Sequence, residues 1–314
     1  MKIALTGATG FIGTKLVAAL LARGDHVTVL TRDAARARAK LGQPPAPAVP
    51  LTIVEANLEQ PGVWQAALDG VEAVVHLAGE PIAGKRWDAR QKQILRDSRI
   101  ESTRHLVQAI ATAAVRPRVL VSTSGADYYP FAKTGVGDFD DDEVTEADPA
   151  GDGFLAKLCT GWEAEARAAE ALGVRVVIMR TGVVLGEHGG ALAKMETPFK
   201  LFGGGRIGSG TQWFSWIHVD DVISAYLAAV ADDRYRGPLN LVTDSVRNAE
   251  FAMQLGRALH RPSWLPVPAF ALRLAVGELA ETLLNGRRVV PAGLRKLGFA
   301  WKHPMLAEAL RSAA

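Results

Sequence analysis

Three glycines near the N-terminus, spaced Gly-x-x-Gly-x-x-Gly, lie between an expected strand and an expected helix, which is the place of a loop that binds the phosphates of a nucleotide. The alternative is that they are turn glycines of another α/β protein. Gly7, Gly10 and Gly13 follow a short apolar run and precede a helical pattern. The first glycine permits a tight turn, the second lets backbone N–H groups approach a pyrophosphate, and the third lets the helix pack close to its strand. The N-terminus of that helix then faces the anion. The motif therefore predicts a dinucleotide-binding loop.

Two residues at the end of the second expected strand indicate which dinucleotide is bound. Thr31 and Arg32 follow the glycines by about 20 residues. An acidic side chain at this place accepts hydrogen bonds from the ribose of NAD, whereas an arginine can pair with the 2′-phosphate of NADP. Asp33 comes next, but it precedes a helical pattern, and we interpret it as the N-cap of that helix. The sequence therefore favours NADP(H).

Hydroxyl groups follow the fifth expected strand, where they could exchange a proton with a substrate. Ser124 ends the run Val121-Ser122-Thr123-Ser124, and Tyr128 and Tyr129 come shortly after it. If the chain is an enzyme, we expect Ser124 and a tyrosine hydroxyl, that of Tyr129, to handle the proton. The alternative is that both rings only line a pocket.

A parallel sheet is needed to bring these residues together, and the first 180 residues predict one. Short β-branched runs alternate there with helical patterns, which is typical of an α/β, Rossmann-type doubly wound sheet. We expect strands over 3–6, 26–30, 51–55, 73–77, 119–122 and 174–180, and helices over 12–21, 63–68, 88–113 and 154–172. The glycine loop, Arg32 and Ser124 then meet at the carboxyl edge of the sheet.

The regular alternation stops after residue 180, where a second unit is expected. Segment 203–210 is rich in glycine and predicts a turn or a close approach to substrate, with Arg206 able to face an anionic group. Helices are predicted over 218–232, which has one apolar stripe, and near 248–259, 269–284 and 304–312. We therefore predict a Rossmann domain over 1–180, to which 211–242 returns, and a smaller, mostly helical substrate lobe over 181–210 and 243–314.

Composition excludes several classes of function. The 36 lysines and arginines are scattered and form no patch for nucleic acid. No uncharged apolar stretch reaches the roughly 18 residues of a membrane span. The single cysteine and the dispersed histidines provide neither a disulfide framework nor the spacing of a metal site. We expect a cytoplasmic protein with a small-molecule substrate, without metal, nucleic acid or membrane as partner, and a possible homodimer through the helix over 88–113.

Several motifs together resemble the extended short-chain dehydrogenases/reductases of the NAD(P)-dependent epimerase/dehydratase type. They are the glycine loop, the turn His76-Leu77-Ala78-Gly79, the strand end before Gly125 and segment 216–222. Segments 78–82, 182–186 and 203–210 are similar to an atypical branch with a C-terminal helical domain. The resemblance implies that substrate lies between the doubly wound domain and the smaller lobe. The cofactor contacts expected from the motifs and the resemblance are Gly7, Thr9, Gly10, Phe11, Ile12, Gly13, Thr31, Arg32, Asn57, Leu58, Leu77, Ala78, Gly79, Glu80 and Ser122.

The chain departs from that family at the Tyr-x-x-x-Lys pair, which supplies the family's proton donor. Counted back from Glu163, the lysine position holds Cys159 and the tyrosine position holds Leu155. Neither replaces a tyrosine whose pKa a nearby ammonium lowers, and we interpret Cys159 as a small buried hydrophobe. A literal Tyr129-x-x-x-Lys133 lies in a loop, which does not hold residues four apart on one face. Two hypotheses follow: an NADP-dependent oxidoreductase or epimerase, and an NADP-binding regulatory module without turnover.

Overall fold

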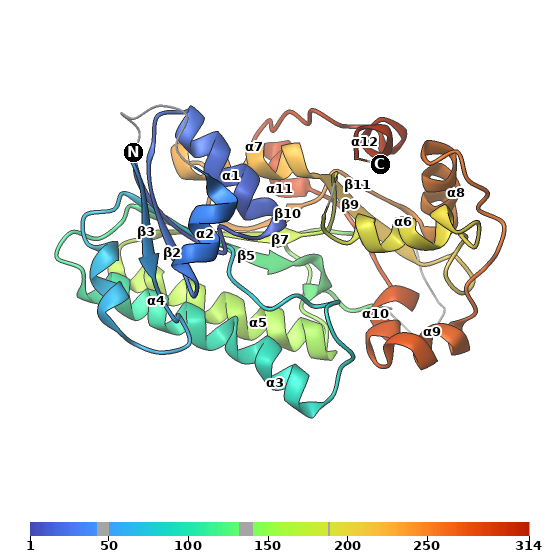
Figure 1. Cartoon of the computed structure of the whole chain (residues 1–314), viewed down its shortest axis with the longest axis horizontal. Helices are drawn as coiled ribbons and strands as arrows, with labels where there is room; N and C mark the ends of the chain where they lie inside the picture. The colour runs from blue at the N-terminus through green and yellow to red at the C-terminus, as the bar shows by residue number, and fades with distance from the viewer. Residues whose placement is uncertain (43–49, 132–140, 188, 314) are drawn as a thin grey trace.

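A seven-stranded parallel sheet forms the centre of the molecule (Figure 1). The computed structural model describes residues 1–42, 50–131, 141–187 and 189–313. The sheet order is β10-β7-β5-β4-β1-β2-β3. Its strands are β1 (Lys2–Thr6), β2 (His26–Thr31), β3 (Leu51–Glu55), β4 (Ala73–His76), β5 (Val119–Gly125), β7 (Arg175–Thr181) and β10 (Gly237–Leu241). The predicted doubly wound α/β fold is confirmed, and its strand order reverses between β1 and β4, where such folds bind ligands.

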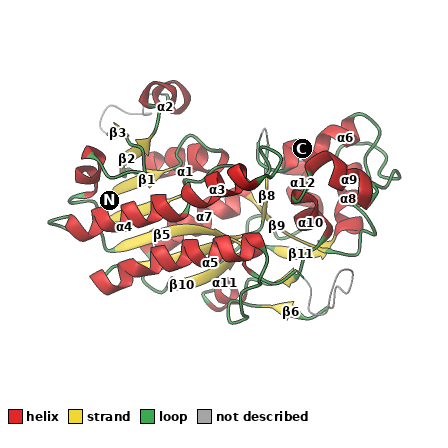
Figure 2. Ribbon diagram, turned by 90° about the horizontal axis from the view of Figure 1, so that it is seen from below, coloured by secondary structure: helices red, strands yellow, loops and turns green. Residues whose placement is uncertain are grey.

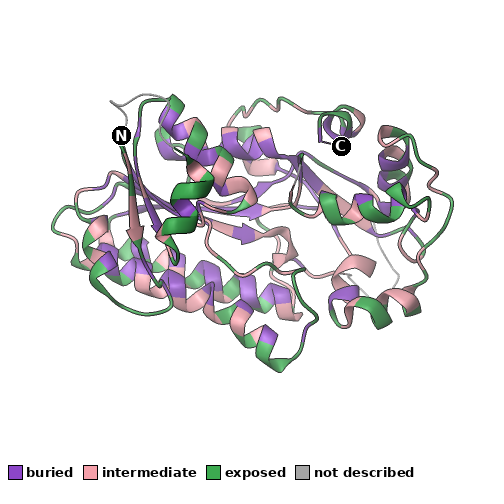
Figure 3. Cartoon of the chain, viewed as in Figure 1, coloured by how far each residue is buried: buried purple, intermediate pink, exposed green. Residues whose placement is uncertain are grey.

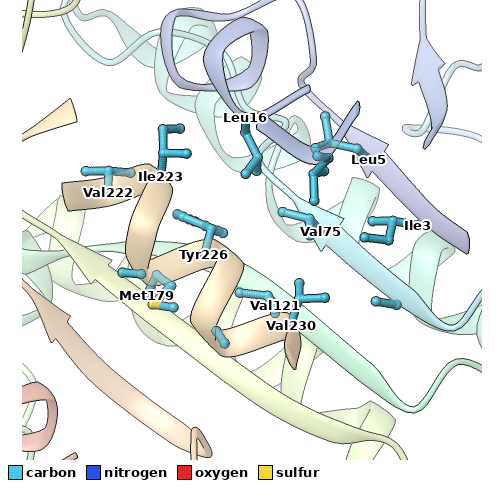
Figure 4. Packing of buried hydrophobic residues seen from close by; sticks show 14 of the residues in the cluster. Ile3, Leu5, Leu16, Val75, Val121, Met179, Val222, Ile223, Tyr226 and Val230 are labelled. Carbon is cyan, nitrogen blue, oxygen red and sulfur yellow. The ribbon is translucent and has the colours of Figure 1, made fainter. Parts of the chain in front are cut away.

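Helices cover both faces of this sheet (Figure 2). One face packs against α1 (Phe11–Ala22) and α7 (Val219–Ala231), and the other against α4 (Ile100–Thr112) and α5 (Phe154–Arg167). Successive side chains of a strand point to opposite faces, so Leu5 joins the core under α1 and α7 while Ala4 joins the core under α4. Figure 4 shows the first of these cores, with Tyr226 of α7 packed among strand residues. Burial on both faces explains why the strands read as continuous apolar runs (Figure 3).

The single helix expected over 88–113 is wrong, because the structure interrupts it. Its two parts are α3 (Ala89–Asp97) and α4, with Ser98 and Arg99 between them. The Arg99 side chain donates to the backbone oxygens of Leu95 and Glu80, which fixes the chain at the interruption. The helix expected over 269–284 also divides, into α9 (Ala269–Val276) and α10 (Leu279–Leu284), at Gly277 with φ of +63°. A positive φ is accessible to glycine and ends a helix.

The chain beyond β7 builds a second layer of structure beside the sheet. A three-stranded sheet has the order β11-β9-β8, formed by β11 (Asp244–Arg247), β9 (Trp213–His218) and β8 (Val183–Leu185). Within 211–242, α7 and β10 return to the large sheet, whereas β9 pairs in the small one. The remaining elements are α2 (Ala34–Leu41), β6 (Glu143–Val144), α6 (Leu192–Lys200), α8 (Asn248–Ala258), β12 (Arg288–Val289), α11 (Ala292–Lys296), α12 (Leu306–Ala313) and 3-10 helices over Val63–Leu68, Ala126–Tyr128 and Ala168–Leu172.

A separate core holds this second layer together. Trp216 of β9 packs there with Phe251 and Leu255 of α8 and with Leu306 and Leu310 of α12. Helix α7 belongs to the core of the large sheet, as expected for segment 211–242. The division of the chain into two domains stays a prediction. Among the described residues, no helix has the length and apolar character needed to cross a membrane.

Candidate functional site

A cavity of about 460 Å³ lies at the carboxyl ends of β1, β2 and β4, where the strand order reverses. Most of the predicted cofactor residues line it: Gly7, Thr9, Gly10, Thr31, Arg32, Asn57, Leu58, Leu77, Ala78, Gly79 and Glu80. The wall does not include Phe11, Ile12, Gly13 or Ser122. The ring of Phe11 packs against Gly189 instead, and Ser122 is buried within β5. We name this space the β1–α1 cavity.

The glycine loop has no room for side chains. Gly7 has a φ of +70°, and a Cβ atom there would lie 2.7 Å from the carbonyl carbon of Leu77. A Cβ atom on Gly13 would lie 2.2 Å from the backbone oxygen of Gly7. Helix α1 begins after Gly10 without a side-chain cap, so its first N–H groups stay free of a capping side chain. A tight turn before an uncapped helix N-terminus is suited to binding a pyrophosphate.

Arginines dominate the part of the cavity beyond β2. Arg32 and Arg36 both line the wall, together with Glu59. The expected N-cap is confirmed: the Asp33 carboxylate accepts a hydrogen bond from Arg36 N at 2.8 Å, so it is committed to α2. Sequence reasoning missed Arg36, although it lies one helical turn beyond Arg32. Two guanidinium groups can bind the 2′-phosphate of a dinucleotide.

Buried polar groups fix the turn after β4. Thr6 Oγ1 lies 2.8 Å from His76 Nδ1 and accepts from the backbone N–H groups of Leu77 and Ala78, each at 3.2 Å. His76 Nε2 lies 2.9 Å from Thr103 Oγ1. Burial, aided by a nearby arginine charge, lowers the pKa of His76 to about 3. The imidazole is therefore neutral at physiological pH, and it positions the turn rather than exchanging protons.

Two residues at the interruption between α3 and α4 hold the same turn in place by hydrogen bonds. Ser98 Oγ accepts from Glu80 N at 3.1 Å, and Arg99 Nη2 donates to the Glu80 oxygen at 2.9 Å. A Cβ atom on Gly79 would lie 3.1 Å from Arg99 Cζ, so the guanidinium packs directly against the loop. Burial lowers the pKa of Arg99 to about 10, which still leaves it charged at neutral pH. Ser98 and Arg99 were hidden in the sequence by an otherwise continuous helical pattern.

A second cavity, of about 220 Å³, lies between the end of β5, the strand β9 and the turn after α10. Its walls are partly apolar, with Phe131, Val183, Met195, Trp213 and Phe214, and partly polar, with Asp127, Tyr129, Gln212, Asn248, Asn285 and Arg287. Arg206 is exposed and lies outside this wall, so its ability to face an anionic group stays a prediction. The glycine-rich segment contributes Ile207 instead. We name this space the β5–β9 cavity.

Ser124 and Tyr129, the predicted proton-handling residues, belong to one buried polar network. Ser124 Oγ donates to Glu163 Oε1 at 2.8 Å. Arg180 donates to both carboxylate oxygens of Glu163, each at 2.8 Å. Arg180 Nη1 also donates to the Tyr129 hydroxyl at 2.9 Å, and that hydroxyl donates to Asn240 Oδ1 at 2.6 Å. The network joins β5, α5, β7 and β10 beside the β5–β9 cavity.

Both hydroxyl protons are donated to acceptors within this network. Burial raises the pKa of Tyr129 to about 12, against the opposing charge of Arg180. Ser124 is 2% exposed and its proton goes to a carboxylate. A role for either residue in proton exchange with a substrate stays a prediction, and the observed contacts make them elements that hold the cavity wall.

Comparison with known proteins identifies the family. The model of the NAD dependent epimerase/dehydratase family matches residues 3–241, and a domain of unknown function, DUF1731, matches residues 267–313. This chain belongs to the NAD dependent epimerase/dehydratase family. The resemblance found in its motifs is thereby confirmed.

Relatives match this family member along its whole length. An Arabidopsis thaliana protein named epimerase family protein SDR39U1 homolog, chloroplastic, is 42% identical and covers 99% of this chain and 86% of its own. The crystal structure of human epimerase family protein SDR39U1 with NADPH has a TM-score of 0.84 at 35% identity, covering 100% and 99% of the two chains. A nucleoside-diphosphate sugar epimerase from Corynebacterium glutamicum has a TM-score of 0.75 at 29% identity, covering 100% of this chain and 58% of that one.

In this member, a leucine and a cysteine stand at the positions where extended members of the family carry their Tyr-x-x-x-Lys pair. Leu155 and Cys159 are 4% and 6% exposed on α5. Burial raises the pKa of the Cys159 thiol to about 12, and its Sγ lies 3.8 Å from the Gly125 oxygen. The thiol therefore stays protonated, as expected for a buried hydrophobe. Lys133, of the literal Tyr-x-x-x-Lys spacing, lies outside the described residues.

A cluster of two histidines and an aspartate lies at the start of α7, outside the walls of both cavities. His218, Asp220 and His303 place one potential ligand atom each within 4.8 Å of one another. His218 Nδ1 accepts from Asp220 N at 3.2 Å, so this ring nitrogen caps the helix and has no lone pair left for a metal. The two imidazole rings stack with centroids 3.7 Å apart. These contacts join the start of α7 to the C-terminal segment that contains His303.

Proposed function

We propose that this chain binds NADP(H) in the β1–α1 cavity and transfers a hydride between the nicotinamide and a carbonyl or carbinol carbon of a small polar or sugar-like substrate. The observation that supports NADP(H) binding is that an uncapped glycine loop, Arg32 and Arg36 line the same cavity. The crystallised human relative contains NADPH, which supports the same choice. When bound, the nicotinamide supplies or accepts the hydride.

The residues present fit the phosphate groups of that dinucleotide. The Gly7–Gly10 turn and the N-terminus of α1 would bind the pyrophosphate, and the two arginines would bind the 2′-phosphate. The turn over Leu77–Glu80, held by Thr6 and Arg99, would carry the cofactor toward the end of β5. The β5–β9 cavity lies beyond that point, and its mixture of amide, guanidinium and aromatic side chains suits a small polar substrate.

A second function is supported by the altered proton-donor positions. Leu155 and Cys159 offer no acid at physiological pH. An NADP-binding regulatory module without turnover accounts for that observation. We also expect a cytoplasmic location and a homodimer through α3 and α4, and neither expectation is required by the proposed reaction.

One experiment separates the two functions. The purified protein is incubated with NADPH or NADP and with glyceraldehyde, dihydroxyacetone and UDP-glucose, following nicotinamide absorbance and product stereochemistry. We expect turnover that is lost in Gly13→Ala, whose Cβ would lie 2.2 Å from the Gly7 oxygen, and kept in Gly153→Ala, whose Cβ would have no neighbour nearer than 4.0 Å. Tight NADPH binding with no conversion of any probe contradicts the enzyme and favours the regulatory module.

A further inference from the structure

The proposed reaction needs a group that can gain and lose a proton near neutral pH, and the obvious hydroxyls do not provide it. Tyr129 and Ser124 donate their protons within a buried network, and the Cys159 thiol has a pKa of about 12. We propose that Asp127 is the proton donor and acceptor of this site, in place of the tyrosine that extended members of the family use. The inference rests on the proposed function.

Asp127 has the right place in the fold. It lies in the 3-10 helix Ala126–Tyr128, which begins where β5 ends, and its side chain lines the β5–β9 cavity. A Cβ atom built on Gly125 would lie 3.5 Å from Asp127 Oδ2 and 3.5 Å from Cys159 Sγ. The carboxylate therefore lies beside the helix position at which the family carries its lysine.

The charge of Arg99 couples Asp127 to the turn that lines the β1–α1 cavity. Arg99, whose charge acts on Asp127, donates to the Glu80 oxygen and packs against Gly79, and both of those residues line the β1–α1 cavity. Asp127 itself belongs to the wall of the β5–β9 cavity. Asp127 therefore lies in the wall of the β5–β9 cavity and is coupled through the charge of Arg99 to the turn that borders the β1–α1 cavity.

The surroundings tune this carboxyl for proton exchange. Burial raises the pKa of Asp127 to about 6, while its own backbone N–H and the Arg99 guanidinium act in the opposite direction. Cys159, which stays a neutral thiol, and the backbone of Gly125 also lie close to it. A carboxyl with a pKa near the working pH populates both its acid and its base forms, which is the requirement for general acid–base catalysis.

The Asp127 carboxyl can give its proton in reduction and take one up in oxidation. In reduction, a hydride adds to the carbonyl carbon of the substrate, the C=O π bond breaks, and the protonated Asp127 carboxyl gives its proton to the resulting oxygen. The product is an alcohol, the cofactor is oxidised, and the Asp127 carboxylate regains a proton from water in the open cavity. In oxidation, the carboxylate accepts the hydroxyl proton as the hydride leaves the carbon.

The test compares Asp127→Asn with Asp152→Asn, which removes an exposed carboxylate from the loop before α5. With the probe that the wild-type protein converts, we expect Asp127→Asn to lower kcat by about 100-fold or more and to abolish the limb of the pH–rate profile near pH 6. NADPH affinity, measured by calorimetry, should stay within about threefold of wild type in both variants, because neither residue lines the β1–α1 cavity.

A second readout does not depend on turnover. In carbon-13 NMR of the NADPH complex, we expect one aspartate carboxyl resonance to titrate near pH 6 and to be missing from Asp127→Asn. The inference alone is overturned if the protein converts a probe while Asp127→Asn keeps the wild-type kcat and pH profile, or if the Asp127 resonance titrates below about pH 4.5. A protein that binds NADPH and converts no probe contradicts the proposed function, and the assignment of Asp127 is then withdrawn with it.

Discussion

The ion pair between Glu163 and Arg180 offers the sharpest test of how the site is held. The two side chains are 5% and 3% exposed, and the guanidinium donates to both carboxylate oxygens at 2.8 Å. The substitution Arg180→Met keeps an unbranched apolar stem of comparable length and removes the charge. It leaves the Glu163 carboxylate buried with Ser124 as its remaining hydrogen-bond donor among the contacts described above.

The magnitude follows from the burial of the pair. Breaking a buried ion pair by removing one partner costs about 3–5 kcal/mol, because an uncompensated charge stays in a medium of low dielectric constant. We expect Arg180→Met to lose about that much free energy of unfolding. The double variant Arg180→Met with Glu163→Gln should recover a large part of the loss, because no buried charge then remains unpaired.

The assay is equilibrium unfolding in urea at neutral pH, without cofactor, on both variants and the wild type. Arg273→Met is the matched control, since Arg273 pairs with Glu281 at 2.8 Å but both side chains are about half exposed. That control should cost less than about 1 kcal/mol. If Arg180→Met costs no more than the control, or if the double variant is less stable than Arg180→Met, the buried pair does not hold the wall of the β5–β9 cavity.

Two further predictions concern the glycine loop and the raised pKa. Gly13→Ala should weaken NADPH binding by at least about tenfold and lower the melting temperature by several degrees, because its Cβ would lie 2.2 Å from the Gly7 oxygen. Calorimetry measures the affinity and thermal unfolding measures the melting temperature, with Gly153→Ala as the control. An unchanged affinity for NADPH contradicts the assignment of the glycine loop. The pKa of Asp127 is raised by folding, from 3.8 to about 6, so its ionisation destabilises the fold as pH rises through that window. Asp127→Asn should therefore be more stable than wild type by about 3 kcal/mol at about pH 8, with no advantage below about pH 4. Urea unfolding across that pH range measures the difference, and a stability advantage that does not change with pH refutes the prediction.

The sequence predicted the parts of the site that depend on local chemistry. The strand before Gly7, the glycine spacing and the N-cap at Asp33 each depend on neighbours a few residues away, and the structure has all of them. The apolar stripe of α7 likewise specifies its buried face without further information. These features were sufficient to predict the doubly wound sheet and the sheet edge at which the β1–α1 cavity lies.

What the sequence did not predict depends on contacts between distant segments. Arg99 lies in a helical pattern that gives no sign of interruption, and the bonds of Ser98 and Arg99 to the distant Glu80 become visible in the structure alone. Arg287, which the sequence analysis did not single out, lines the β5–β9 cavity because the turn after α10 packs against β9. Asp127 looks like an ordinary acidic residue in a loop, and its raised pKa exists only once the surrounding chain buries it.

The most direct test of the central claim is the affinity of the purified protein for NADPH and for NADH, measured by calorimetry at one salt concentration. Arg32 and Arg36 line the β1–α1 cavity, and a charge-assisted hydrogen bond to a phosphate contributes about 1.5–3 kcal/mol. We predict that NADPH binds at least about tenfold more tightly than NADH, and that Arg32→Ala with Arg36→Ala removes this preference while leaving NADH affinity within about threefold. Equal or tighter binding of NADH by the wild-type protein would contradict the account.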